Sequence, residues 1–230
     1  MHRLKTLFEQ HTGQRPENVV ELPSSGSNRR YFRMTAGDIC LIGALGTSVD
    51  ENKAFWAIAT HFHKQGLPVP EVYAHDEEFT CYIQQDLGDQ ILFNCIEEGR
   101  TRGKYSEEER ALLRETMASL PTLQFEGANG FDFSICYPQP EFDERMISFD
   151  LNYFKYCFLK ATGLDFSELK LEEDFRRMSD VLMRSSSSTF LYRDFQARNV
   201  MLVDGKPYFI DFQGGRKGPI YYDVASFVWQ

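Results

Sequence analysis

Residues 190–211 read FLYRDFQARNVMLVDGKPYFID, and this stretch decides the fold. Its residue types predict a strand at Phe190–Tyr192, then a polar loop, and a second strand at Asn199–Val203. The Asp204-Gly205 dipeptide that follows favours a two-residue hairpin turn, because both positions of that turn require positive φ. A returning strand over Lys206–Ile210 then completes a β-hairpin.

The short turn also fixes which residues face each other across the hairpin. With two residues in the turn, Val203 pairs with Lys206, and the register places Asn199 opposite Ile210. Asp211, the next residue, therefore lies beside Asn199 at the open end of the hairpin. We expect polar side chains to gather there, where the backbone leaves the sheet.

Asp194 lies in the loop that leads to this open end. Phosphoryl transfer requires an Asp that acts on the proton of the attacking hydroxyl, and an Asn and a second Asp that hold Mg²⁺ against the nucleotide phosphates. The spacing Asp194-x-x-x-x-Asn199, followed after the hairpin by Asp211-Phe212, resembles the catalytic loop and metal-binding Asp of the protein-kinase-like superfamily. The alternative is an ordinary hairpin with polar ends, since Asp and Asn at this spacing also occur by chance.

The overall composition is that of a globular protein, with 42% hydrophobic and 26% charged residues. The length of 230 residues suits one large domain or two small lobes that share a cleft. The net charge of −9 argues against a nucleic-acid-binding protein, whose contact surface is usually basic. It does not argue against ATP, because Mg²⁺ and a few basic residues offset phosphate charge.

The cysteines and apolar stretches favour a cytosolic protein. Five cysteines are scattered without a C-x-x-C pair, which favours reduced thiols. No stretch has the apolar length of a signal peptide or a membrane span, so we expect neither. The cysteines are Cys40, Cys81, Cys95, Cys136 and Cys157.

The first part of the chain has the pattern of an antiparallel meander with one long helix. A short helix over residues 3–11 precedes it, and Ser48 or Asp50 caps the long helix, which runs to Gln65. The small polar residues 23–28 form a loop that either closes over phosphates with its backbone N–H groups or merely connects strands. The expected strands span residues 18–22, 29–35, 39–43, 71–75 and 79–85.

From Ile91 onward the pattern is mostly helical. Ser106–Glu109 predicts a capping box, and further helices are expected over residues 142–161 and 166–183. Residues 214–219 are expected to form a mobile basic loop. The helix that begins at Tyr221 reaches the last residue without a cap, which predicts a longer natural protein. The aromatic residues of the 142–161 helix have the spacing of a buried face, and we expect them in the core: Phe149, Tyr153, Phe154, Tyr156 and Phe158.

Together these motifs and their order resemble the aminoglycoside phosphotransferase and choline kinase family. Within it, the likeness is greatest to the bacterial anomeric kinases of cell-wall amino sugars, the N-acetylmuramate/N-acetylglucosamine kinases. The general resemblance spans nearly the whole chain, whereas the amino-sugar subgroup rests mainly on R-R-Y-F-R and D-F-Q. The segments that carry it are Ser24–Arg33, Asp86–Asp89, Tyr192–Met201, Ile210–Gln213 and Gly218–Ser226.

The resemblance implies an α+β, protein-kinase-like fold with two lobes. An N-lobe, residues 1–88, would be an antiparallel sheet with one helix that binds the nucleotide. A C-lobe, residues 89–230, would be mostly helical and carry the catalytic hairpin and the acceptor site. The resemblance further implies a cytoplasmic enzyme of peptidoglycan recycling that uses ATP and Mg²⁺, acts on a small-molecule acceptor, and has no nucleic-acid or membrane partner.

It also implies roles for individual residues. Asp194 would be the catalytic base, Asn199 and Asp211 would hold Mg²⁺, and Asp223 would anchor the catalytic loop by accepting its backbone N–H groups. The expected nucleotide contacts are Ser25, Gly26, Ser27 and Arg30, together with Gln85 and Leu87, whose backbone would meet adenine. The expected acceptor contacts are Asp143, Gln196 and Arg198.

Two positions depart from the family pattern. Ile42 stands near the position of the Lys that touches the α- and β-phosphates in kinases, so Arg30 or Arg33 is the candidate for that charge. Tyr192 stands where a His usually precedes the Arg-Asp pair, which alters the packing of the loop without removing the base.

Three functions remain open at this point. The first is a kinase that phosphorylates a sugar hydroxyl, the anomeric one of N-acetylmuramate or N-acetylglucosamine. The second is an aminoglycoside- or choline-type kinase with a cationic acceptor, which the negative net charge would suit. The third is a nucleotide-binding pseudokinase module, which the missing Lys favours and the presence of Asp194, Asn199 and Asp211 disfavours.

Overall fold

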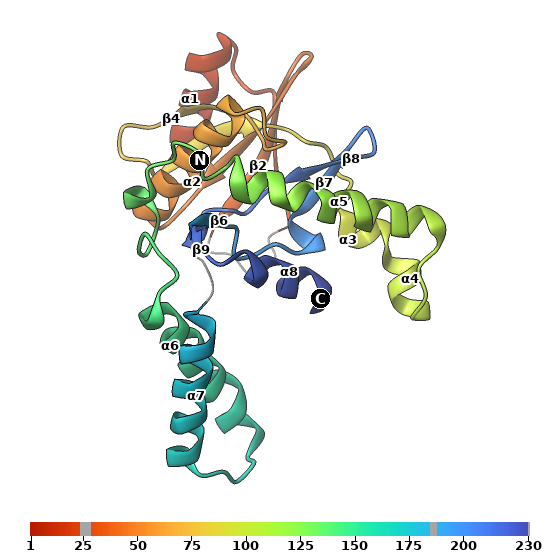
Figure 1. Cartoon of the computed structure of the whole chain (residues 1–230). Helices are drawn as coiled ribbons and strands as arrows, with labels where there is room; N and C mark the ends of the chain where they lie inside the picture. The colour runs from red at the N-terminus through yellow and green to blue at the C-terminus, as the bar shows by residue number, and fades with distance from the viewer. Residues whose placement is uncertain (24–28, 185–187, 230) are drawn as a thin grey trace.

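The computed structural model describes residues 1–23, 29–184 and 188–229 (Figure 1). Its first part is a five-stranded antiparallel sheet in the order β1-β2-β3-β5-β4, flanked by two helices. The strands are β1 (Asn18–Glu21), β2 (Arg30–Ala36), β3 (Ile39–Leu45), β4 (Val72–His75) and β5 (Cys81–Gln85), and the helices are α1 (His2–Thr12) and α2 (Val49–Lys64).

The two faces of this sheet pack against different helices, because side chains alternate along each strand. On one face, Phe32 and Met34 of β2 pack with Phe8 of α1. On the other face, Tyr82 of β5 stacks on Phe55 of α2, with ring centroids 5.0 Å apart. The side chains that point to the second face are therefore the ones available to a cleft beneath the sheet.

The rest of the described chain is mostly helical and carries two small antiparallel sheets, β7 with β8 and β6 with β9. The capping box predicted at the start of α5 is confirmed. The helices are α3 (Leu92–Cys95), α4 (Glu97–Arg102), α5 (Glu107–Phe125), α6 (Glu144–Tyr153), α7 (Glu168–Leu182) and α8 (Ile220–Trp229). The strands are β6 (Thr189–Leu191), β7 (Val200–Val203), β8 (Lys206–Phe209) and β9 (Arg216–Gly218).

A single hydrophobic core joins the sheet to the helical part. The ring of Phe62, on α2, lies 4.8 Å from that of Phe190, on β6. The ring of Phe55 lies 5.0 Å from that of Phe212, just beyond the β7–β8 hairpin. Through these aromatic contacts, α2 packs the sheet against the hairpin and β6.

The prediction that the aromatic residues after Phe142 lie in the core is wrong. Phe149, Tyr153, Tyr156 and Phe158 are between 57% and 66% exposed, and Phe154 is 43% exposed. The reason is tertiary: α6 and α7 form a helical hairpin that projects from the body of the protein (Figure 1), and no described segment covers these side chains. The single predicted helix is also interrupted after Tyr153, by a π-helical turn (Phe154–Leu159) and a 3-10 turn (Lys160–Thr162).

The prediction of a mobile basic loop over residues 214–219 is also wrong. Residues Arg216–Gly218 form β9, which pairs with β6, and Arg216 is only 1% exposed. Strand β6 is buried along its whole length, so its backbone N–H and C=O groups need hydrogen-bonding partners. Strand β9 supplies them.

The expected fold class is confirmed: an N-terminal antiparallel sheet is followed by a mostly helical part that contains the predicted β-hairpin. None of the helices in the described ranges is long and apolar enough to cross a membrane.

Candidate active site

The hairpin has the predicted register. Val203 pairs with Lys206 across the Asp204-Gly205 turn, and the N–H of Ile210 donates to the carbonyl of Asn199 at 3.0 Å. Asn199 and Asp211 consequently lie side by side at the open end, as the sequence predicts, and both line the same cleft.

This cleft has a volume of about 310 Å³ and lies between the first sheet and the hairpin. Two of the expected nucleotide contacts, Gln85 and Leu87, line it, in a segment that links β5 to α3 and that we call the hinge (residues 85–89). The hydrophobic residues of the cleft come from both sides: Leu22, Ile42, Phe55, Leu87, Ile91, Met201 and Ile210. The apolar walls of this slot suit a flat base, and Asn199 and Asp211 line it as well.

An ion-pair cluster holds the hinge against the sheet. Arg33, on β2, donates from Nε and Nη2 to the Asp86 carboxylate at 2.6 and 3.0 Å. Its Nη1 reaches Asp89 at 2.7 Å, and the Cys40 thiol donates to Asp86 at 3.0 Å. Because the carboxylates of Asp86 and Asp89 both pair with Arg33, the positive charge of Arg33 holds the hinge against β2.

Asp194 is partly buried and lies close to Asn199 and Asp211. Its backbone carbonyl accepts a hydrogen bond from the Asn199 Nδ2 group at 2.8 Å. Burial raises the pKa of its carboxyl group, and the nearby Asp211 carboxylate raises it further. The guanidinium groups of Arg193 and Arg216 act in the opposite direction. A carboxylate whose pKa is raised, close to Asn199 and Asp211, is suited to general-base chemistry.

Asp223, on α8, is fully buried and contacts the residues that precede Asp194. Its carboxylate accepts the backbone N–H groups of Tyr192 and Arg193 at 2.9 Å each, and the Gln124 side-chain amide at 3.0 Å. Burial raises the pKa of Asp223 to about 6, against the lowering effect of these donors. Arg193 has a φ of 77°, a conformation that costs energy for a non-glycine residue, and these bonds help to hold it.

Tyr192, directly after β6, forms a hydrogen bond to the chain at the end of the β7–β8 hairpin. Its side chain is fully buried, and its hydroxyl donates to the carbonyl of Ile210, the residue before Asp211. Burial raises the pKa of Tyr192 well above the usual value, so the side chain that packs against the loop is uncharged.

Asn199 and Asp211 present oxygen atoms of the kind that Mg²⁺ prefers. Since Nδ2 of Asn199 donates to the backbone carbonyl of Asp194, its Oδ1 is the atom suited to a metal. The Asp211 carboxylate accepts a hydrogen bond from Gln213 Nε2 at 2.8 Å. Within the described ranges, no group of three or more His, Cys, Asp or Glu side chains could hold a metal by itself. Mg²⁺ at this position would therefore share its ligands with phosphates and water, as it usually does in phosphoryl-transfer sites.

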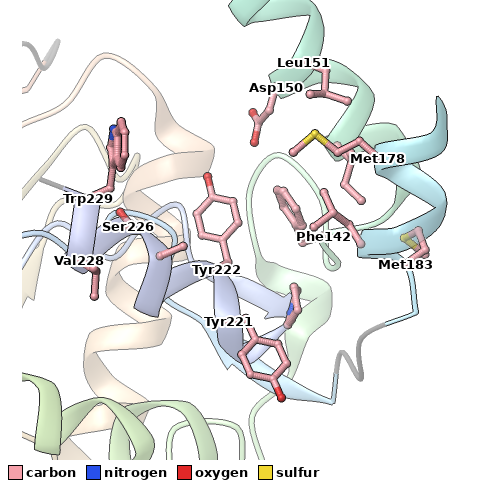
Figure 2. Close-up of a pocket in the computed structure, with 14 residues that line it drawn as sticks. Phe142, Asp150, Leu151, Met178, Met183, Tyr221, Tyr222, Ser226, Val228 and Trp229 are labelled. Carbon is pink, nitrogen blue, oxygen red and sulfur yellow. The ribbon is translucent and has the colours of Figure 1, made fainter. Parts of the chain in front are cut away.

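A second cavity, of about 790 Å³, lies between the α6–α7 hairpin and α8 (Figure 2). Phe142, Leu151, Met178 and Trp229 give it mostly hydrophobic walls. Asp150 lies within it, and the Tyr222 side chain points toward Asp150 in Figure 2.

The polar end of this second cavity lies close to Asp194. The Asp150 carboxylate accepts from Arg193 Nη2 at 2.8 Å, next to Asp194 in sequence. Burial raises the pKa of Tyr222, and the Asp194 carboxylate is close enough to raise it further. A molecule in this cavity could therefore present a polar group to Asp194 while the first cleft holds a nucleotide.

Some of the expected contacts do not reach these cavities. Arg30 points away from the cleft and pairs with Glu21 at 2.8 Å, because it alternates with the cleft-lining residue Tyr31 along β2. Asp143 caps α6 by accepting the N–H of Met146. Arg198 lines the first cleft instead of the second cavity, and neither Gln196 nor Asp194 is among the lining residues of either. Ser25, Gly26 and Ser27 lie outside the described residues.

Three residues that line the two cavities were not among the contacts expected from the sequence. Arg29 is 2% exposed and lines the first cleft. The sequence R-R-Y-F-R indicates that an arginine lines this cleft, but which of the two adjacent arginines does so depends on which face of the sheet each side chain points to. Asp150, on α6, and Tyr222, on α8, line the second cavity, and only the packing of these two helices against the loop that carries Asp194 brings them near it.

The known proteins that this chain resembles include phosphotransferases. The phosphotransferase enzyme family APH has a model that matches residues 18–230. The chain is 27% identical to the N-acetylmuramate/N-acetylglucosamine kinase of Pseudomonas aeruginosa strain PAO1, over 91% of this chain and 59% of the relative. It is 28% identical to the N-acetylmuramate/N-acetylglucosamine kinase of Neisseria meningitidis serogroup B strain MC58, over 92% of this chain and 62% of the relative. The chain thus spans 59–62% of the length of these two curated relatives.

Solved structures show a similar fold. One is a crystal structure of a thermostable mutant of an aminoglycoside phosphotransferase, in a ternary complex with ADP and hygromycin B. It matches with a TM-score of 0.60 at 16% identity, over 97% of this chain and 75% of that chain. At this identity the likeness concerns the fold, and it agrees with the protein-kinase-like architecture expected from the sequence.

Proposed function

This chain belongs to the APH phosphotransferase enzyme family, and we propose that it is an ATP-dependent kinase of a small molecule. The observation that carries the proposal is the convergence of Asp194, Asn199 and Asp211 at the open end of one hairpin, where Asn199 and Asp211 line the first cleft. Residues 1–88 would form the nucleotide-binding lobe, and residues 89–230 the catalytic and acceptor-binding lobe.

ATP would bind in the cleft between the sheet and the hairpin. The backbone of Gln85 and Leu87 would meet the adenine edge, and Ile42 and Ile210 would contact its faces. The Arg33 clamp would keep the hinge backbone in place for this contact. The phosphates would extend toward Asn199 and Asp211.

Asn199 and Asp211 would hold Mg²⁺, and the donor set supports this assignment. Both side chains supply oxygen ligands on neighbouring positions, and the mutual repulsion of the Asp194 and Asp211 carboxylates favours a divalent cation nearby. When bound, Mg²⁺ would offset the charge that develops on the phosphate oxygens.

Asp194 would act on the acceptor. Its carboxylate would orient the acceptor hydroxyl and take its proton as the oxygen forms a bond to the γ-phosphorus. The bond from that phosphorus to the bridging oxygen breaks, and ADP leaves with the electron pair. Asp223 would hold the loop that carries Asp194, through the N–H groups of Tyr192 and Arg193.

We further propose that the acceptor is the anomeric hydroxyl of N-acetylmuramate or N-acetylglucosamine, bound in the second cavity. The volume of about 790 Å³ is within the range of small-molecule sites. Asp150 and Tyr222 would supply the polar contacts at the end next to Asp194. The support for an amino sugar over other acceptors comes from the two bacterial relatives, which are both N-acetylmuramate/N-acetylglucosamine kinases.

A cationic acceptor is the second candidate, because the Asp150 carboxylate lies in the cavity wall and the net charge is −9. ATP consumption by the full chain with N-acetylmuramate, N-acetylglucosamine, an aminoglycoside and choline separates the two. Faster consumption with an amino sugar supports the leading proposal, and faster consumption with a cation supports the second. ATP binding without consumption in any arm would indicate a nucleotide-binding module.

A further inference from the structure

We propose that Gln213 is a positioning residue, whose side-chain amide holds the carboxylate of Asp211 in the orientation that Mg²⁺ requires. This inference rests on the proposed function and concerns a residue to which that function assigns no role. Gln213 is the last residue of the D-F-Q motif, of which the proposed site uses only Asp211.

The contact between the two side chains carries the inference. Nε2 of Gln213 donates to Oδ1 of Asp211 at 2.8 Å, and the bond is partly buried. A hydrogen bond to a carboxylate is stronger than one between two neutral groups, and it restricts rotation of the carboxylate about its Cβ–Cγ bond. With one oxygen held by the amide, the other oxygen keeps a defined direction. Carboxylates that bind metal ions in proteins are commonly held by such hydrogen bonds.

The other end of the amide shows that packing alone does not account for Gln213. Its Oε1 is buried, and among the described residues no group donates a hydrogen bond to it. A buried acceptor without a donor costs free energy, and an apolar side chain of the same size would not incur that cost. The hydrogen bond to Asp211 is therefore the interaction that a glutamine supplies at this position and a methionine would not.

The backbone on both sides of Gln213 is held in place. Phe212 is fully buried, and its ring lies 5.0 Å from that of Phe55 on α2. The N–H of Gly215 donates to the carbonyl of Phe212 at 2.9 Å, which closes a turn over residues 212–215. These contacts fix the position from which the Gln213 side chain reaches back to Asp211.

The same turn also borders Asp194. A Cβ atom added to Gly214 would lie 3.7 Å from Oδ2 of Asp194. The turn that carries Gln213 therefore adjoins both carboxylates of the proposed site, Asp211 through the amide and Asp194 through Gly214. A substitution that displaced the backbone would disturb Asp194 as well, so an experiment on Gln213 has to separate the metal from the rest of the site.

The test measures, by calorimetry, how the binding of ATP to the full chain depends on Mg²⁺ in the parent and in Gln213→Met. Methionine has nearly the size of glutamine but no N–H group to donate. We expect the apparent affinity for Mg²⁺ to fall by about 10- to 100-fold, the range for groups that are hydrogen-bonded to metal ligands. The affinity for ATP in EDTA, where no metal takes part, should stay within about twofold of the parent.

A double-mutant cycle shows whether Gln213 acts through Asp211. In the Asp211→Asn background we expect Gln213→Met to change the apparent affinity for Mg²⁺ by less than about twofold, because the carboxylate that the amide holds is already absent. A further loss as large as in the parent background would make Gln213 a metal ligand in its own right and would overturn the inference.

Gln10→Met, at an exposed position on α1, is the matched control for the chemical change, and we expect it to be neutral. Equal losses with Mg²⁺ and in EDTA for Gln213→Met would indicate a structural role and overturn the inference. If the melting curve shows that this variant does not fold, Gln213→Asn replaces it, because its amide is too short to reach Asp211; the same outcomes then apply.

The two proposals fail in different ways. An unchanged dependence on Mg²⁺ in Gln213→Met, with a weakened one in Asp211→Asn, would overturn the inference alone. An unchanged dependence in both variants, or ATP binding by the parent that does not depend on Mg²⁺, would show that the proposed metal site itself fails, and the inference with it.

Discussion

The Arg193 guanidinium lies 2.8 Å from the Asp150 carboxylate, and this contact joins the residue before Asp194 to the wall of the second cavity. The two residues are 43 positions apart in the sequence. The contact therefore couples the place where we expect the acceptor to the loop that we expect to act on it.

Asp150→Asn tests this coupling. The amide would keep the shape of the side chain but remove the charge that orients Arg193, so we expect the KM for the acceptor to rise by about 3- to 10-fold, the effect of a partly buried ion pair. The KM for ATP should stay unchanged, because Asp150 is not among the residues that line the first cleft. Steady-state kinetics with each substrate varied in turn measure both. Asp165→Asn, at an exposed position between α6 and α7, is the control; a rise in the KM for ATP in the Asp150 variant would contradict the prediction.

Asp194→Asn should lower kcat by about 10²- to 10⁴-fold, the usual effect of removing a general base. ATP affinity should change by less than a few-fold, because Asn199 and Asp211 remain. Single-turnover kinetics and ATP titration on one preparation check the two parts. Asp204→Asn makes the same chemical change at the exposed hairpin turn and should be neutral. A normal kcat with a lower melting temperature in the Asp194 variant would end its catalytic assignment.

Asp211→Asn should act through the metal. Asn tolerates the left-handed backbone that Asp211 adopts, with a φ of 66°, so the fold should be kept. We expect the apparent affinity for Mg²⁺, measured from the Mg²⁺ dependence of ATP binding, to fall by about 10- to 100-fold, the scale of losses at metal sites, and turnover to fall with it. Unchanged Mg²⁺ dependence would sink the assignment of this residue as a ligand.

Asp223→Ala should lower both stability and activity. The change leaves the buried N–H groups of Tyr192 and Arg193 without their acceptor, at about 1–3 kcal/mol for each unsatisfied donor. Urea unfolding measures the loss, with Asp180→Ala on exposed α7 as the control for a general Asp-to-Ala effect. A parental midpoint in the Asp223 variant would contradict the anchoring role.

The same residue predicts a dependence of stability on pH. The pKa of Asp223 is about 6 in the folded chain, above the ordinary value of 3.8, so between these values the folded state binds the proton more tightly than the unfolded state. Its contribution to the unfolding free energy is therefore fully present below about pH 4 and is lost as the pH rises through about 6. We expect the parent to lose up to about 3 kcal/mol relative to Asp223→Asn across this window. A difference between the two proteins that is constant with pH would refute this.

The sequence determined the parts of the site that depend on neighbours along the chain. The Asp204-Gly205 turn fixes the pairing of Val203 with Lys206, and this pairing alone places Asn199 beside Asp211. The capping box at Ser106 could also be predicted from the sequence, because its two hydrogen bonds join residues only three positions apart.

Only the tertiary structure decided which face of an element is covered and by what. Alternation along β2 separates Arg29 from Arg30, but the packing of α1 on one face and α2 on the other assigns Arg29 to the cleft. Helical spacing groups Phe149 and Tyr153 on one face, but it could not show that the α6–α7 hairpin projects into solvent. The contact of Arg193 with Asp150 likewise depends on how α6 docks. Local hydrogen bonds and turn geometry are set by short-range sterics, whereas burial and charge pairing depend on segments that meet only when the whole chain has folded.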